Sequence, residues 1–179
     1  MEEPYTTISF RRSLFCIICL TLSAGLADSK TLNCRRDPHA TVDMPISLAA
    51  GRLVQTPEFA VKHKRYLIEI KAQRVVASEE LACKMGFILN SLDDSCKVEP
   101  VIEANWRVLD GDRVVANGRA DGKSTDFESD ACYMGRFIGD FQGESKRKYV
   151  LEVTFTKDGT VLDANHPHLV VLMDTGLSM

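Results

Sequence analysis

The chain has 179 residues, of which 45% are hydrophobic and 26% are charged, and its formal net charge is −3. This length is sufficient for one domain with a hydrophobic core. A slightly acidic chain lacks the basic surface that nucleic-acid binding requires, so the composition argues against a nucleic-acid partner.

Residues 1–27 have the pattern of an export signal. Arg11 and Arg12 precede an apolar stretch over residues 13–22, and small residues follow up to Ala27. The apolar stretch is shorter than the about 20 residues of a membrane-spanning helix. We therefore expect an extracytoplasmic protein, periplasmic or secreted. An uncleaved N-terminal anchor is the alternative, and this segment would then be its only contact with a membrane.

A polar segment follows over residues 28–43, and we expect it to form an irregular N-terminal arm. Residues 44–179 are interpreted as a single β-sandwich domain. The first long extended run lies within residues 59–76 and alternates in polarity. Tyr66, Ile68 and Ile70 share one side of a strand, and Glu69 and Lys71 share the other side.

A short helix and an acidic loop come next. Ser78 is a suitable N-cap, and Gly86 is a suitable helix terminator. Residues 87–98 then read as a loop, in which the acidic residues lack the alternating spacing and glycine turn of a calcium-binding loop.

Four cysteines follow the export signal, and an even number in an exported chain indicates disulfides rather than a metal site: Cys34, Cys83, Cys96 and Cys132. Cys83 lies at the end of the expected helix and Cys96 ends the next loop, so the chain can return without crossing a sheet. We therefore predict the pairs Cys83–Cys96 and Cys34–Cys132. The rival pairing is Cys83–Cys132 with Cys34–Cys96.

The stretch WRVLDGDRVVANG, residues 106–118, predicts a β-hairpin, because two apolar runs flank an Asp-Gly pair. Ala104, Trp106 and Val108 fall on one face of the first strand, which places Trp106 in the core. We expect Asp110 and Gly111 to form a type I′ turn.

The remaining segments predict one more short helix and three more strands. Thr125 and Glu128 match a capping box for a helix that runs through Cys132 to Gly135. Alternating residues predict strands over 136–141, 148–155 and 169–173. Tyr149 opens a late strand, as does the tyrosine-corner residue of immunoglobulin-like domains. The predicted fold is an immunoglobulin-like antiparallel β-sandwich with one or two short loop helices, and a small β-barrel is the alternative.

The sequence also contains two pairs of similar short segments. RYLIEI and KYVLEV share one pattern, and EELACKMG and ESDACYMG share another. Their order is reversed between the two halves of the chain, so they do not form a simple tandem repeat.

From Cys83 to Val171 the chain contains the strings C-x-M-G, W-x-V-x-D-G, R-F-I-G-x-F, Y-x-L-x-V and P-x-L-x-V. In this array it resembles uncharacterised exported bacterial β-sandwich proteins. The resemblance implies an extracytoplasmic sandwich and no activity, because the shared residues are glycines, an aromatic residue and alternating apolar residues.

We find no motif of a nucleophilic hydrolase, a zinc protease or a nucleotide-binding loop, and we predict no cofactor. His166 and His168 are the best candidates for metal ligands, because alternate residues of an extended chain point the same way. Two ligands are too few for a metal site, however, and an extended turn into a strand explains both residues.

The sequence therefore favours a non-catalytic module that binds another protein of the cell envelope, and an inhibitor or immunity-type protein is one version. One alternative is a module that binds a small ligand or carbohydrate, for which Tyr133 and Phe127 are the candidate exposed aromatic residues. Another is an enzyme with an unrecognised site near His166 and His168.

Overall fold

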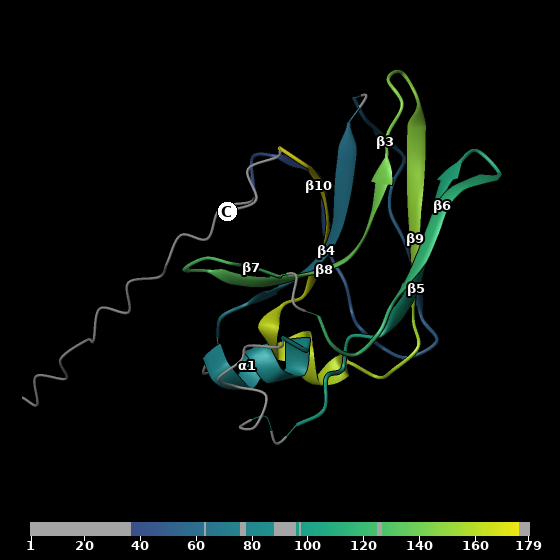
Figure 1. Ribbon diagram of the computed structural model, residues 1–179. Helices are drawn as coiled ribbons and strands as arrows, with labels where there is room; N and C mark the ends of the chain where they lie inside the picture. Colours follow the sequence, from purple (N-terminus) through teal and green to yellow (C-terminus); the bar gives the residue numbers. More distant parts are fainter. Residues whose placement is uncertain are drawn as a thin grey trace, which may run out of the picture. The chain divides into compact units, whose positions relative to one another are not determined.

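The computed structural model describes residues 37–62, 64–75, 78–87, 96, 98–124 and 127–175. In this part of the chain, two antiparallel sheets pack face to face (Figure 1). Sheet A has the strand order β1-β10-β4-β8-β7. Sheet B has the order β2-β9-β5-β6, and β3 also pairs with β9. The predicted all-β sandwich is confirmed, and the alternative of a closed barrel is wrong.

The strands of sheet A are β1 (Ala40–Pro45), β4 (Arg65–Gln73), β7 (Phe127–Ser129), β8 (Tyr133–Gln142) and β10 (His168–Met173). Those of sheet B are β2 (Leu53–Gln55), β3 (Phe59–Ala60), β5 (Ala104–Asp110), β6 (Arg113–Ala120) and β9 (Lys148–Phe155). The helix α1 (Ser78–Met85) and the 3₁₀ helix η1 (Thr160–Asn165) lie at one end of the sandwich (Figure 1). Within the described ranges, no helix has the length and apolar character to cross a membrane.

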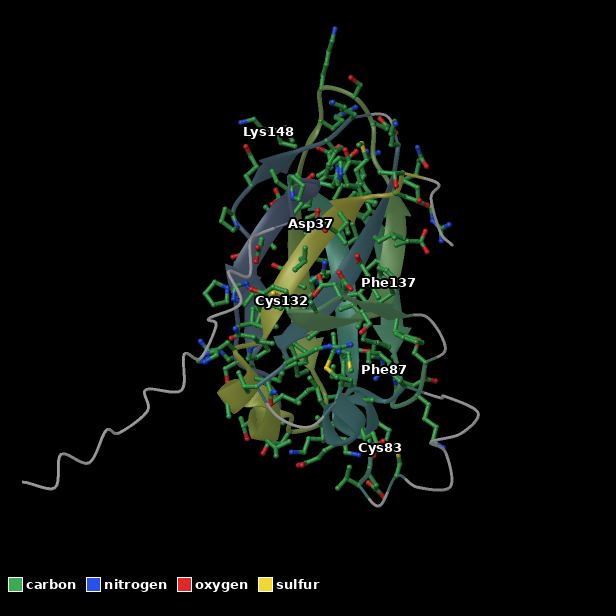
Figure 2. All side chains as sticks on the ribbon, turned by 90° about the vertical axis from the view of Figure 1, so that its left-hand side faces the viewer. Asp37, Cys83, Phe87, Cys132, Phe137 and Lys148 are labelled. Atoms are coloured by element: carbon green, nitrogen blue, oxygen red, sulfur yellow. A yellow bond between two sulfur atoms is a disulfide. The ribbon has the colours of Figure 1, made fainter. Side chains whose placement is uncertain are left out.

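The helix α1 ends as the sequence predicts. Gly86 has a φ of +85°, and its N–H donates to the carbonyl oxygens of Ala82 and Cys83. The predicted disulfide between Cys83 and Cys96 is present, with the two Cα atoms 5.5 Å apart, and Figure 2 labels Cys83 in α1. It joins α1 to the start of the segment that leads into β5.

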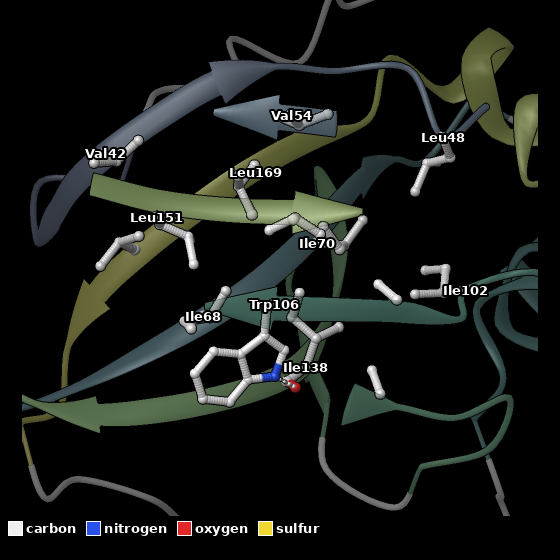
Figure 3. Close-up of a cluster of buried hydrophobic side chains, with 14 of the residues drawn as sticks. Val42, Leu48, Val54, Ile68, Ile70, Ile102, Trp106, Ile138, Leu151 and Leu169 are labelled. Atoms are coloured by element: carbon white, nitrogen blue, oxygen red, sulfur yellow. Dashed lines mark hydrogen bonds between the residues drawn. The ribbon is translucent and has the colours of Figure 1, made fainter. Parts of the chain in front are cut away.

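The core lies between the two sheets (Figure 3). Alternate residues of β4 and β9 point inward and are buried, as the sequence predicts: Tyr66, Ile68 and Ile70 on β4, and Tyr149, Leu151, Val153 and Phe155 on β9. The shared pattern of these two strands is also structural. The hydroxyl of Tyr66 accepts from the N–H of Lys62 at 2.9 Å, and that of Tyr149 accepts from the N–H of Glu144 at 3.0 Å. Each tyrosine therefore anchors the segment before its strand, in the manner predicted for Tyr149.

Trp106 is buried, as predicted, and connects the two sheets (Figure 3). From β5 in sheet B, its indole N–H donates to the carbonyl oxygen of Ile138 on β8 in sheet A, at 2.8 Å. The ring lies between Gly118 of β6 and Gly139 of β8, and a Cβ at either glycine would overlap it. The indole thus fills the space between β6 and β8, where no backbone hydrogen bonds join the two strands.

Arg136 holds together the end of the sandwich where α1 lies. Its side chain is fully buried and donates to the carbonyl oxygens of Met85 at 2.9 Å, Ile102 at 3.0 Å and Gly122 at 3.1 Å, and also to that of Asp121. Burial lowers the pKa of Arg136 to about 10, which still leaves the guanidinium charged at neutral pH. One side chain therefore connects β8, α1, the segment that leads into β5 and the segment after β6.

Two predictions of local structure are wrong. The hairpin loop consists of Gly111 and Asp112, and only Gly111 has a positive φ, of +61°, so the turn is of the II′ kind rather than I′. The second helix is absent, since β7 and β8 occupy residues 127–129 and 133–142. The Oδ1 atom of Asp130 accepts from the N–H groups of Cys132 and Tyr133, at 2.6 and 2.7 Å, and so forms the turn between these strands.

The predicted irregular arm, residues 28–43, gives way to a strand earlier than expected. The strand β1 begins at Ala40 because it pairs with the last strand, β10, which no local pattern reveals. Cys132 is disulfide-bonded. Its predicted partner, Cys34, and the predicted export signal lie outside the described residues, so that pairing and the signal stay predictions.

Candidate functional site

The structure does not bring the two candidate histidines into one site. His166 is exposed at the end of η1, with a φ of +45°. His168 lies on β10, and its Nδ1 atom is 2.5 Å from the Oδ1 atom of Asp43 on β1. Among the described residues, no group of three or more His, Cys, Asp or Glu side chains has the geometry to hold a metal ion.

His168 instead lines a small hollow of about 280 Å³ on the outer face of sheet A. Asp37, Asp43, Lys71 and Tyr133 share this hollow. Its side chains are already engaged with one another, since His168 contacts Asp43 and the Lys71 Nζ atom lies 3.4 Å from Asp37.

The two aromatic residues expected to contact a carbohydrate do not form a platform. Phe127 on β7 is 38% exposed, and its ring packs on Phe87 with the centroids 4.8 Å apart. Tyr133 lines the hollow beside His168, whereas Phe127 lines a different one. Stacking on a sugar requires aromatic faces in one place, so this arrangement does not favour the carbohydrate-binding alternative.

The most distinctive exposed feature is β6, the last strand of sheet B. It is eight residues long, and among the strands of the described residues it pairs with β5 alone. Val114 is 44% exposed and Val115 is 38% exposed. An edge strand leaves every other N–H and C=O group without a partner strand and can therefore pair with a strand of another chain. Exposed valines on such an edge add apolar surface for that contact.

A β-bulge shapes the exposed part of β6. Val108 pairs with Ala116 and Leu109 pairs with Val114, so Val115 has no counterpart on β5. The extra residue explains why two consecutive valines are both exposed, although side chains normally alternate across a strand.

Two shallow hollows flank β6. One, of about 670 Å³, lies on the outer face of sheet B, where Leu53 and Val114 contribute apolar surface. The other, of about 780 Å³, lies between the end of β6 and the part of β8 that β7 does not cover, and Phe127 and Phe137 contribute to it. A segment added along β6 would thus have side-chain space on both faces.

The charges around β6 are mostly balanced within the chain. Arg113 contacts Asp110 at 3.2 Å, and Arg107 forms an ion pair with Glu152. Arg119 is exposed near the end of β6, and among the described residues no carboxylate lies within ion-pair distance of it. It can therefore receive a carboxylate from another molecule.

Sequence reasoning predicted the hairpin but not its place at the edge of a sheet. The pair Val114-Val115 between Arg113 and Asn117 was the available signal, because consecutive exposed valines break the alternation of a half-buried strand. Sheet order, however, depends on long-range pairing, which the hairpin pattern does not contain.

Comparison with known proteins gives information about the fold only. No protein-family model and no curated protein matches the sequence. The chain is similar to a crystal structure of a protein from Sulfurospirillum deleyianum, with 12% sequence identity and a TM-score of 0.53. The match covers 78% of this chain and 99% of that one. At this identity the likeness extends to the architecture, and it supports the β-sandwich that the sequence resemblance implies.

Proposed function

We propose that this protein is a non-catalytic binding module that takes up an extended segment of another protein along β6. The observation that carries this proposal is the eight-residue strand β6, whose outer edge pairs with no other strand of the described residues and carries two exposed valines. Main-chain hydrogen bonds to such an edge supply affinity, and pockets for alternate side chains supply specificity. No cofactor enters this proposal.

The surroundings of β6 specify the chemistry of the segment. Apolar side chains of the segment would fill the hollow beside Leu53 and Val114, and a carboxylate would pair with Arg119. The partner segment is therefore expected to alternate apolar and polar residues and to carry an acidic residue near the end that lies against Arg119.

We further propose that the partner is a protein of the cell envelope and that this chain acts as an inhibitor or immunity-type protein. The disulfide between Cys83 and Cys96 is compatible with an extracytoplasmic location, because such bonds persist in oxidising compartments. The predicted export signal is the second support.

The proposal is tested by photo-crosslinking in an envelope extract. A photoreactive amino acid at position 115 is expected to capture one partner, which is then identified by mass spectrometry and purified. The matched control places it at Val161 on η1, which is 50% exposed and lies outside β6. Capture of the same protein at equal yield from both positions would contradict the proposal.

Purified partner then allows a direct test of strand addition. Hydrogen exchange in residues 113–119 is expected to slow on complex formation, and the double change Val114→Lys and Val115→Lys should abolish binding, because charges block edge pairing. Val161→Lys should bind normally. Binding that survives the double change and leaves exchange in β6 unaltered would show that the partner uses another surface.

A further inference from the structure

The outer face of sheet A contains a buried ionic cluster centred on Lys71. The Lys71 Nζ atom lies 3.4 Å from Asp37, 3.4 Å from Glu69 and 3.5 Å from Glu128. These carboxylates come from three segments: the start of the described chain, β4 itself and β7. The side chain of Lys71 is 10% exposed, so solvent screens these attractions only weakly.

Glu69 is the unusual member of this cluster. It is fully buried, and neither carboxylate oxygen accepts a hydrogen bond within the described part of the chain. It lies over Gly135 of β8, where a Cβ would overlap the carboxylate. The sequence places Glu69 and Lys71 on the polar side of β4, but the structure buries both of them.

Among the described residues, the groups around Glu69 do not balance its charge. β4 contributes Lys71, β7 contributes Glu128 and the initial segment contributes Asp37. On the far side of Lys71, Asp43 of β1 and His168 of β10 are engaged with each other. β8 contributes Gly135 and Phe137, which carry no charge, and Tyr133, which lines the same hollow as Lys71 together with Asp130 of the turn before β8. With all three carboxylates ionised, one ammonium group faces three negative charges.

We propose that Lys71 and Glu69 form a proton-dependent clasp, in which the protonation state of Glu69 sets how tightly the segment at Asp37 and the strand β7 are held on sheet A. When Glu69 is protonated, the Lys71 ammonium group forms ion pairs with Asp37 and Glu128 without competition from Glu69. When Glu69 is ionised, it competes for the same ammonium and repels the other two carboxylates. Figure 2 shows Asp37 over this face of the sheet.

The pKa values of the two residues agree with this geometry. Burial raises the pKa of Glu69 from its ordinary value of 4.5 to about 8, and Lys71 offsets only part of that effect. Burial lowers the pKa of Lys71, but the carboxylates outweigh it and raise the pKa overall, so Lys71 stays charged.

The direction of the pH effect follows from linkage. Opening the clasp exposes Glu69 to water and returns its pKa towards 4.5. Below that value Glu69 is protonated in both states, and pH has no effect through this group. Between about 4.5 and 8 the clasped state holds a proton that the opened state has lost, so opening becomes easier as pH rises. Above about 8 the effect is constant.

Hydrogen exchange followed by mass spectrometry measures the opening directly, with each variant compared to the native chain at the same pH. At about pH 8.5, Glu69→Gln is expected to slow exchange in residues 37–45 and 127–133 by at least about tenfold, because the amide cannot ionise and one unit of pKa corresponds to a tenfold change. At about pH 5 the difference should be much smaller.

The matched control is Glu152→Gln. Glu152 occupies the same place in the shared strand pattern on β9, is also buried, and pairs with Arg107 on sheet B. It should leave exchange in residues 37–45 and 127–133 unchanged. Equal exchange in the native chain and Glu69→Gln at about pH 8.5, or an equal effect of Glu152→Gln, would overturn the proposal.

Lys71→Met provides a second, independent variant. Without the ammonium group, residues 37–45 and 127–133 should exchange rapidly at both pH values, whereas native protection would contradict the clasp. If Lys71→Met does not fold, as judged by circular dichroism, the comparison of Glu69→Gln with Glu152→Gln decides.

Discussion

At the scale of single residues, two side chains connect parts of the sandwich that are distant in the sequence. Trp106 extends from sheet B to the backbone of sheet A, and Arg136 binds carbonyl groups of three other segments. Both side chains are buried, so their loss leaves buried carbonyl groups without a donor. The stability of the protein should therefore be unusually sensitive at these two positions.

Trp106→Ala is expected to lower the free energy of unfolding by about 3–5 kcal/mol, the usual range for a large buried aromatic residue. Gly118 and Gly139 offer no side chains that could move into the cavity. Chemical denaturation followed by circular dichroism measures the loss. A loss below about 1 kcal/mol would mean that the indole does not support the joint between the sheets.

Arg136→Met is expected to cost at least about 3 kcal/mol, because each buried carbonyl group left without a donor costs about 1–3 kcal/mol. Arg136→Lys should recover part of this loss, since an ammonium group has three donors but a shorter reach. The same denaturation experiment compares the two variants. Equal stability of Arg136→Lys and Arg136→Met would show that the hydrogen bonds to the carbonyl groups are unimportant.

At the scale of secondary-structure elements, most strands could be predicted because one of their faces is buried and the other is polar. The second pair of similar segments shows a limit of predicting secondary structure from local pattern. EELACKMG forms helix α1, whereas the matching ESDACYMG spans the end of β7 and the start of β8. Similar local patterns thus adopt different structures. The capping-box residues Thr125 and Glu128 predict a helix, because the pairing of β7 and β8 cannot be seen in that short segment.

The disulfide between Cys83 and Cys96 is expected to stabilise the fold through the unfolded state. Closing a loop of 13 residues contributes about 3 kcal/mol in the chain-entropy model. Changing both cysteines to serine should lower the free energy of unfolding by about that amount and leave the sheets intact. A thermal scan with circular dichroism tests this, and unchanged stability would argue against an entropic role for the bond.

At the scale of the whole molecule, the sandwich class could be predicted, but the position of each strand in its sheet could not. β1 pairs with β10, so the two ends of the described chain are neighbours in sheet A. That pairing, and the exposure of the β6 edge, result from long-range contacts. The burial of Glu69 and Lys71 also escaped prediction, because the alternation in β4 marks their side as polar and does not reveal what covers it.

The location of the protein is a prediction about the whole chain. If residues 1–27 are removed on export, the mature protein begins near Asp28. Intact-mass measurement of protein from the extracytoplasmic fraction tests this. Retention of Met1 to Ala27 in that fraction would indicate an N-terminal anchor instead.

Trp106 also gives the protein a built-in optical reporter. It is the only tryptophan in the sequence, and its ring lies between β6 and β8. Any event that moves β6 relative to sheet A alters the surroundings of the indole and hence its emission spectrum. The same fluorophore can therefore follow both unfolding and the arrival of a partner at β6, without a label and without changing a residue.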